Sequence, residues 1–189
     1  MSMIEALRVF KFGGTSVGSA QTMTAVAKLV SIELLEGPLI VVASAMSTVT
    51  DSLVSANQAA AQGDFETVDE CLKSIRSLHH RTIDSLAIPE LATEKKREID
   101  ELLGQALRIL RATAFLRELT PRAQDAVLSV GEKLSVRVLA IALDGADVPV
   151  EVIDADTFLD TDARFGDANP LGGVGAVSYT HLTLPTKRI

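Results

Sequence analysis

The stretch Val-Phe-Lys-Phe-Gly-Gly-Thr-Ser-Val, residues 9–17, decides how the chain begins to fold. A short apolar strand leads into a lysine, two adjacent glycines and two hydroxyl side chains, and a helical pattern follows. Glycine has no Cβ, so backbone N–H groups can close around phosphate oxygens, and a helix N-terminus adds partial positive charge. Lys11 adds a full positive charge. The order predicts an anion-binding loop, although paired glycines taken alone are more typical of a tight turn.

Two common phosphate-binding motifs are excluded for this loop. A Walker A motif needs Gly-Lys-Ser/Thr after a four-residue gap, and a dinucleotide fingerprint needs Gly-x-Gly-x-x-Gly. Neither spacing occurs at residues 9–17. The loop therefore belongs to another class of phosphate site.

The surrounding pattern predicts a βαβ unit. Residues 7–12 are expected to form a strand buried on both faces, because they are apolar except for two basic residues. Ser19 can cap a helix that reaches about Leu35, and Gly37-Pro38 ends it. A second buried strand is expected at residues 39–43. The two strands should be parallel and joined by a right-handed crossover.

The remaining chain is predicted to be mostly helical. Over residues 50–119, apolar residues recur at helical spacing, with interruptions at Gly63-Asp64 and at Pro89. The same spacing over residues 121–143 predicts one further helix, which ends at Gly145. A third strand is expected at residues 148–153.

Adjacent histidines at 79 and 80 point about a hundred degrees apart on a helix, so we expect solvated side chains there rather than a metal site.

Composition limits the classes of partner and compartment. The 189 residues carry a net charge of −7, which argues against nucleic acid as a partner. The single cysteine excludes an intramolecular disulfide. No apolar run is long enough to cross a bilayer, and no secretory signal is evident at the N-terminus. We therefore expect a cytoplasmic protein with no membrane partner.

Two further segments could carry chemistry. Ser44 to Asp51 follows the second predicted strand, at the sheet edge where α/β proteins bind ligands. Within it, Thr50 is equally suited to be an ordinary helix N-cap. In the segment from Ser129 to Ser135, Glu132 lies among apolar residues, although a glutamate on a helix is usually a surface residue.

The string Lys-Phe-Gly-Gly-Thr-Ser-Val closely resembles the opening motif of the aspartokinases, within the amino acid kinase family. Residues 44–51 resemble the Ser-Ala-x-x-x-x-Thr-Asn/Asp element of that family, and residues 131–135 resemble its Gly-Glu-x-hydrophobic-Ser element. The segment Arg164-Phe165-Gly166 is a supporting match. The resemblance implies an α/β, three-layer α-β-α amino acid kinase fold with a mostly parallel sheet, truncated here. It also implies a helical insert at about residues 50–120.

By this resemblance, the protein phosphorylates the side-chain carboxylate of L-aspartate with ATP and Mg²⁺, the entry step to lysine, threonine and methionine synthesis. The resemblance assigns Lys11 to catalysis and assigns the ATP phosphates to Lys11, Phe12, Gly13, Gly14, Thr15 and Ser16. It assigns L-aspartate to Ser44, Thr50, Glu132 and Arg164, with Glu132 on the amino group, and it assigns no metal ligand.

The resemblance covers residues 1–177 as the N-terminal part of a catalytic domain, and the later elements of the family are not found in this sequence. We therefore expect the chain alone to be inactive, and its full-length parent to be a homo-oligomer. Residues 178–189 match nothing in the family and are interpreted as a non-native tail. The alternatives are another amino acid kinase, acting on glutamate or acetylglutamate, and a non-catalytic fragment or binding module.

Overall fold

The computed structural model describes residues 7–87 and 89–171. The chain divides into two compact units, residues 1–152 and 153–189. The predicted non-native tail, residues 178–189, lies outside the described residues. The first unit contains the segments with resemblance to phosphate and amino-acid sites, except for Arg164.

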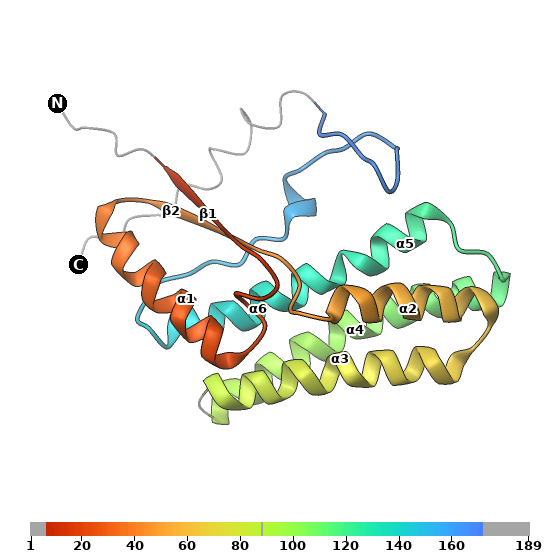
Figure 1. The fold of residues 1–189 in the computed structure, drawn as a ribbon, viewed down its shortest axis with the longest axis horizontal. Helices are drawn as coiled ribbons and strands as arrows, with labels where there is room; N and C mark the ends of the chain where they lie inside the picture. The colour runs from red at the N-terminus through yellow and green to blue at the C-terminus, as the bar shows by residue number, and fades with distance from the viewer. Residues whose placement is uncertain (1–6, 88, 172–189) are drawn as a thin grey trace. The chain divides into compact units, whose positions relative to one another are not determined.

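The predicted βαβ unit is confirmed. Strand β1 (Arg8–Phe12) pairs in parallel with β2 (Leu39–Ala43), and α1 (Ala20–Glu33) connects them with the short 3₁₀ helix η1 (Leu34–Glu36), as Figure 1 shows. Ser19 caps α1, and its hydroxyl accepts the Thr22 amide in a reciprocal capping box. The register places Phe12 opposite Ala43, so both strands end at the same edge of the sheet.

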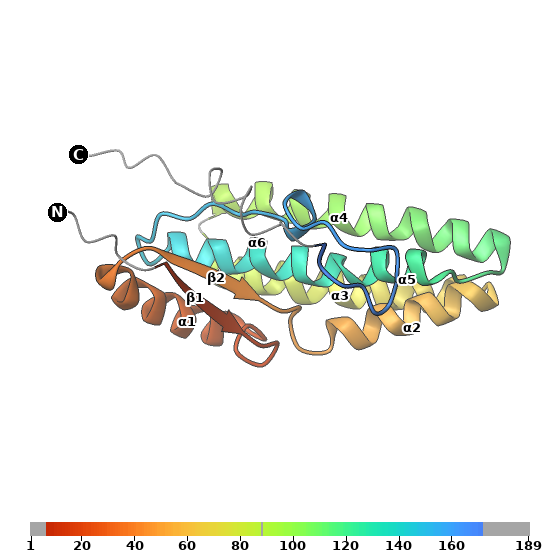
Figure 2. The ribbon, with the colours of Figure 1, turned by 90° about the horizontal axis from the view of Figure 1, so that it is seen from above.

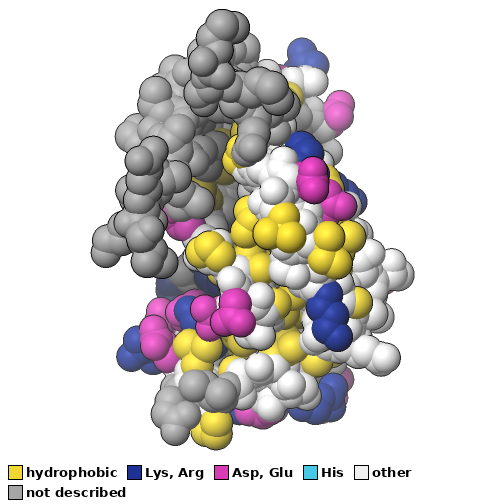
Figure 3. Space-filling view, turned by 90° about the vertical axis from the view of Figure 1, so that its left-hand side faces the viewer, with side chains coloured by type: hydrophobic (Ala, Val, Ile, Leu, Met, Phe, Trp, Pro, Cys, Tyr) yellow, Lys and Arg dark blue, Asp and Glu magenta, His cyan; other side chains and the backbone are white. Residues whose placement is uncertain are grey.

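The prediction that both strands are buried on both faces is wrong. Val9 is 61% exposed and Val42 is 43% exposed, while Phe12 packs against the core. A parallel strand is buried on both faces only where helices cover both. The described helices leave the Val9 face of this sheet open. Figure 3 shows hydrophobic side chains exposed among charged ones on the left-hand side of the molecule as drawn in Figure 1.

Helices form the rest of the first unit. They are α2 (Val49–Gln62), α3 (Phe65–Leu86), α4 (Pro89–Leu116), α5 (Pro121–Leu128) and α6 (Val130–Asp144). Helices α2, α3 and α4 pack on one another, and α6 packs on α1, α3 and α4 (Figures 1 and 2). The predicted helical region after residue 49 is thus confirmed, including its breaks at Gly63 and before Pro89.

The single helix predicted for residues 121–143 is in fact two. Thr120 caps α5, and Ser129 alone separates α5 from α6, although its own backbone is helical (φ −59°, ψ −18°). The Ser129 hydroxyl donates to the Ala126 carbonyl, 3.0 Å away. Such a bond competes with the helical ladder. Helix α6 begins after this break, at Val130.

The strand predicted at residues 148–153 is not present in the described structure. Val148 is buried and its amide donates to the Leu143 carbonyl, but Val150 and Val152 are exposed. Pro149 has no backbone N–H to donate to a ladder. A strand also needs a neighbour, and β1 and β2 pair only with each other among the described residues. The second unit, as far as it is described, contains the 3₁₀ helix η2 (Ala155–Thr157) and an antiparallel bridge between Thr161 and Pro170.

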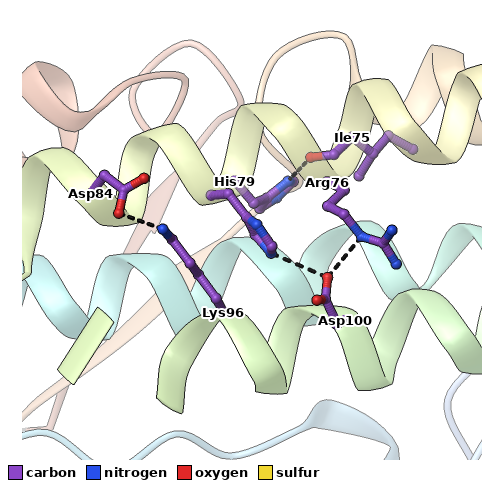
Figure 4. A network of polar contacts seen from close by, with 7 residues as sticks. Ile75, Arg76, His79, Asp84, Lys96 and Asp100 are labelled. Atoms are coloured by element: carbon purple, nitrogen blue, oxygen red, sulfur yellow. Dashed lines mark hydrogen bonds and ion pairs between the residues drawn. The ribbon is translucent and has the colours of Figure 1, made fainter. Parts of the chain in front are cut away.

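The prediction of solvated histidines is wrong, because His79 is buried beneath α3 and the half-buried His80 faces Asp100 on α4. His79 is fully buried, and its Nδ1 donates to the Ile75 carbonyl at 2.7 Å (Figure 4). His80 Nε2 lies 3.1 Å from Asp100 Oδ1, and Arg76 Nε donates to the same oxygen at 2.8 Å. Periodicity showed their different directions but not that other helices would cover them.

Burial lowers the pKa of His79 below its ordinary 6.5, and the neighbouring His80 lowers it further, while the hydrogen bond to Ile75 opposes the shift. Above pH 6.5 the imidazole is neutral in both folded and unfolded chains. Below pH 6.5 the unfolded chain binds a proton that the folded chain does not, until the folded pKa is reached. The free energy of unfolding should therefore fall as the pH drops below 6.5, by about 1.4 kcal/mol for each unit of pKa depression.

Urea unfolding between pH 8 and pH 5 measures this loss. His79→Leu should flatten the acid part of the profile, whereas the control His80→Gln should retain most of it, because burial is the larger cause of the lowered pKa. An equally steep loss in His79→Leu would contradict the assignment to His79.

Candidate functional site

The glycine loop between β1 and α1 is a tight turn held by its own backbone. The Gly13 carbonyl accepts the Ser16 amide at 2.9 Å and the Val17 amide at 3.3 Å. Val17 is fully buried and fixes the end of the turn in the core. The tight turn and the anion loop expected from the sequence are therefore compatible.

The two glycines of this loop have different surroundings. A Cβ on Gly14 would lie 2.9 Å from the Ala45 carbonyl oxygen, so the loop after β2 leaves room for hydrogen only. A Cβ on Gly13 would meet no atom within 4 Å. Packing therefore requires glycine at 14, whereas at 13 the space beside the backbone is open to a ligand.

Residues 44–49 form the second wall of the site. The Ser44 amide donates to the Phe12 carbonyl at 3.0 Å and continues the β1–β2 ladder by one bond. The Val49 amide donates to the Met46 carbonyl, so Ser47 and Thr48 occupy the tip of a turn. Thr48 has a left-handed backbone, with φ of 72°. A threonine rarely adopts this conformation, and such residues concentrate at functional loops.

The interpretation of Thr50 as a helix N-cap is wrong. Helix α2 begins at Val49, so Thr50 is its second residue, and Thr48 occupies the N-cap position without a side-chain hydrogen bond. The Thr50 side chain is exposed. Its predicted role in contacting the amino-acid substrate is untouched by this correction.

The N-terminus of α6 closes the site from a third side. A Cβ on Gly131 would lie 3.0 Å from the Ala45 Cβ and 3.3 Å from a methyl group of Leu53. Ala45 is therefore in close contact with both Gly14 and Gly131. The three segments singled out in the sequence meet around this one residue.

Charged and polar side chains at this edge remain available to a ligand. Lys11 and Glu132 are exposed, on β1 and in the first turn of α6. Within the described residues, no ion pair involves Lys11. Thr15 is exposed, and Phe12, Ser16 and Ser44 are half-buried. The end of β1 and the glycine loop offer a cation and backbone amides to an anion, and the start of α6 offers a carboxylate suited to an ammonium group.

Arg164 belongs to the second unit. Its side chain is exposed, and its amide donates to Asp162 Oδ1 at 3.1 Å. That bond lowers the pKa of Asp162, as does the bond from the Asn169 amide, which has the larger effect. The substrate role of Arg164 stays a prediction.

Residues 7–87 and 89–171 contain no group of three or more His, Cys, Asp or Glu residues that could hold a metal ion. In the same described ranges, no helix is long and apolar enough to cross a membrane.

Sequence reasoning missed two contributors to this geometry. Ser47 donates from its hydroxyl to the Gly14 carbonyl at 3.0 Å, and Gly131 permits the approach of α6 to Ala45. The only available signal for Ser47 was its place in a hydroxyl-rich segment after a strand. A contact between segments 33 residues apart cannot be read from either segment alone.

Comparison with known proteins agrees with this arrangement. The family model described as "Amino acid kinase family" matches residues 6–180. Aspartokinase 1, chloroplastic, of Arabidopsis thaliana is 36% identical over 150 residues, which cover 78% of this chain and 25% of the relative. Lysine-sensitive aspartokinase 3 of Escherichia coli is 30% identical over 163 residues, covering 86% of this chain and 34% of the relative.

Solved structures show the same likeness. E. coli aspartokinase III in complex with aspartate and ADP, in its R-state, superposes with a TM-score of 0.79 at 28% identity. The match covers 94% of this chain and 38% of that structure. The T-state complex with lysine and aspartate gives a TM-score of 0.69. The chain thus spans about a quarter to two fifths of the length of these relatives.

The two glycines should respond differently to substitution. Gly14→Ala places a methyl group against the Ala45 carbonyl and should lower the free energy of unfolding by about 1–3 kcal/mol. Gly13→Ala has room for its methyl group and should leave the fold intact, while it obstructs an anion at the loop. Urea unfolding and Mg-ATP titration of both variants separate the two effects. Equal destabilisation by both substitutions would contradict the difference in packing.

Proposed function

Because the chain belongs to the amino acid kinase family and is homologous to aspartokinases over most of its length, we propose that it forms the N-terminal part of an aspartate kinase. The reaction is transfer of the γ-phosphoryl group of ATP to the side-chain carboxylate of L-aspartate, giving 4-phospho-L-aspartate and ADP. The observation that carries the proposal is the meeting of three segments around Ala45.

Lys11 and the glycine loop are proposed to bind the phosphates. Phosphoryl transfer requires neutralisation of charge on the moving group and alignment of two anionic reactants. Lys11 lies one residue before the end of β1, and Gly13 leaves the loop backbone open on one side. The amides of the loop and the hydroxyls of Thr15 and Ser16 supply further donors. Mg²⁺ would neutralise negative charge on the nucleotide phosphates.

Glu132, Ser44 and Thr50 are proposed to bind L-aspartate. Glu132 is exposed in the first turn of α6, beside Gly131 and hence close to Ala45. Its carboxylate would pair with the substrate ammonium and select against dicarboxylates without an amine. Ser44 and Thr50 would contribute hydroxyls, and Arg164 a positive charge toward a carboxylate.

This chain spans only part of the length of its relatives, and we therefore expect slow turnover. Since it spans about a quarter of the plant aspartokinases, we expect binding of Mg-ATP and L-aspartate with far slower ADP release than in a full-length aspartokinase. A coupled ADP assay, with hydroxylamine to capture the acyl phosphate, measures turnover on aspartate, glutamate and acetylglutamate. Phosphorylation of either alternative substrate in preference to aspartate would contradict the proposed specificity.

Removal of the Lys11 charge should weaken Mg-ATP binding by about 10-fold or more, because a hydrogen bond to a charged group is being lost. Titration calorimetry on Lys11→Ala measures the change. The matched control is Lys28→Ala, since Lys28 is exposed on α1 and has no proposed role. Equal affinity in wild type and Lys11→Ala would contradict the role of Lys11.

Glu132→Gln should reduce the preference for L-aspartate over succinate by about 10-fold, because succinate lacks the amine that the carboxylate pairs with. The ratio of the two dissociation constants, measured by NMR titration, reports on this contact alone. Glu36→Gln is the control, since Glu36 is exposed in η1. An unchanged ratio in Glu132→Gln would remove Glu132 from the substrate site.

A further inference from the structure

Ser47 connects the loop after β2 to the glycine loop. Its Oγ donates to the Gly14 carbonyl at 3.0 Å, and this bond is partly buried. The Gly14 carbonyl and the Thr15 N–H belong to one planar, trans peptide unit, in which the two groups point in opposite directions. A donor that holds the carbonyl therefore also fixes the direction of the Thr15 N–H, away from Ser47.

The Ser47 side chain also packs against the exit of the glycine loop. A Cβ on Gly18 would lie 2.9 Å from Ser47 Oγ and 3.1 Å from the Gly14 carbonyl oxygen. Gly18 directly precedes Ser19, the cap of α1. One hydroxyl thus lies between the middle of the glycine loop and the start of the helix that follows it.

The turn that carries Ser47 is fixed on both sides. Met46 and Val49 are each 1% exposed, and the Val49 amide donates to the Met46 carbonyl at 3.1 Å. Thr48 keeps a left-handed backbone in this turn at a conformational cost. The buried neighbours hold the turn in place, so the position of the Ser47 hydroxyl is determined by the core.

We propose that Ser47 is a positioning residue for phosphate binding: its hydroxyl holds the Gly14–Thr15 peptide so that the Thr15 N–H faces the nucleotide phosphates. Glycine at position 14 has no Cβ to restrict rotation of this peptide, so without the hydroxyl the carbonyl can turn toward the phosphates and repel them. The inference rests on the proposed function for the identity of the anion. The hydrogen bond from Ser47 to Gly14 does not depend on that function.

The first experiment measures the loop without any ligand. Residue-resolved amide exchange by NMR on the full chain should show the Ser16 and Val17 amides exchanging about fivefold faster in Ser47→Ala, as expected from the loss of one hydrogen bond. The control Ser55→Ala, on the exposed side of α2, should leave these rates unchanged. Amides in α3 serve as an internal reference for global unfolding. Unchanged rates at Ser16 and Val17 in Ser47→Ala would overturn the proposal.

The second experiment adds Mg-ATP to the same samples. In the wild type and in Ser55→Ala, the Thr15 amide resonance should shift on titration, and Ser47→Ala should bind about fivefold more weakly with a smaller shift. Equal affinity and an equal Thr15 shift in Ser47→Ala would overturn the positioning role. If the wild-type chain binds no Mg-ATP, the proposed function fails for this chain, and the exchange rates alone then decide whether Ser47 orders the loop.

A second variant, at Gly18, tests the same hydrogen bond between Ser47 and Gly14. Gly18→Ala introduces a methyl group at 2.9 Å from Ser47 Oγ and should displace the hydroxyl from Gly14. It should therefore reproduce the faster exchange of Ser16 and Val17. Retention of wild-type exchange in Gly18→Ala would count against the proposal, because the hydroxyl would then not be confined between the two glycines.

Discussion

The structure of the site depends on the close approach of three chain segments to Ala45. The parallel pairing of β1 and β2 brings the ends of both strands to one edge of the sheet, and the loops that follow must then share a small space. They do so because Gly14 and Gly131 have no Cβ to collide with the Ala45 carbonyl and methyl groups. A side chain on either would separate the glycine loop from the segment that resembles a substrate site.

The helix starts add an electrostatic consequence to this packing. Helices α1, α2 and α6 follow directly from the glycine loop, from the Ser47 turn and from the break at Ser129. A helix N-terminus carries partial positive charge, which favours anions nearby. The first turn of α2 contains Asp51 and that of α6 contains Glu132, both exposed. Acidic side chains here are stabilised by the helix while they remain free to meet a cationic group, which suits a substrate with charges of both signs.

The βαβ unit could be predicted because its signals are local: a capping serine, a glycine-proline stop and two apolar strands. The three site segments were found by resemblance for the same reason, since each is a short string. The features that could not be predicted depend on distant neighbours. The burial of His79 requires helices that pack on α3, and the exposure of Val9 depends on which helices cover the sheet. The absence of a strand at 148–153 reflects the lack of a paired neighbour among the described residues. The break at Ser129 has a local signal, but one hydroxyl in an apolar run is compatible with a continuous helix.

The buried core of this chain lies mostly on its helices, whereas the candidate binding loops are attached to its edge. Two parallel strands of five residues contribute few ladder bonds, and short isolated sheets of this kind are marginal without helices packed on them. Most of the fully buried large side chains, including Leu53, Ile83 and Leu103, lie on the helices instead. The glycine loop and the Ser47 turn are attached to that core through Val17, Met46 and Val49. Substitutions at polar positions between these attachments can therefore change the direction of a loop peptide while the helical core stays folded. The same helices that stabilise the chain thus hold the turn around Thr48 in its strained conformation.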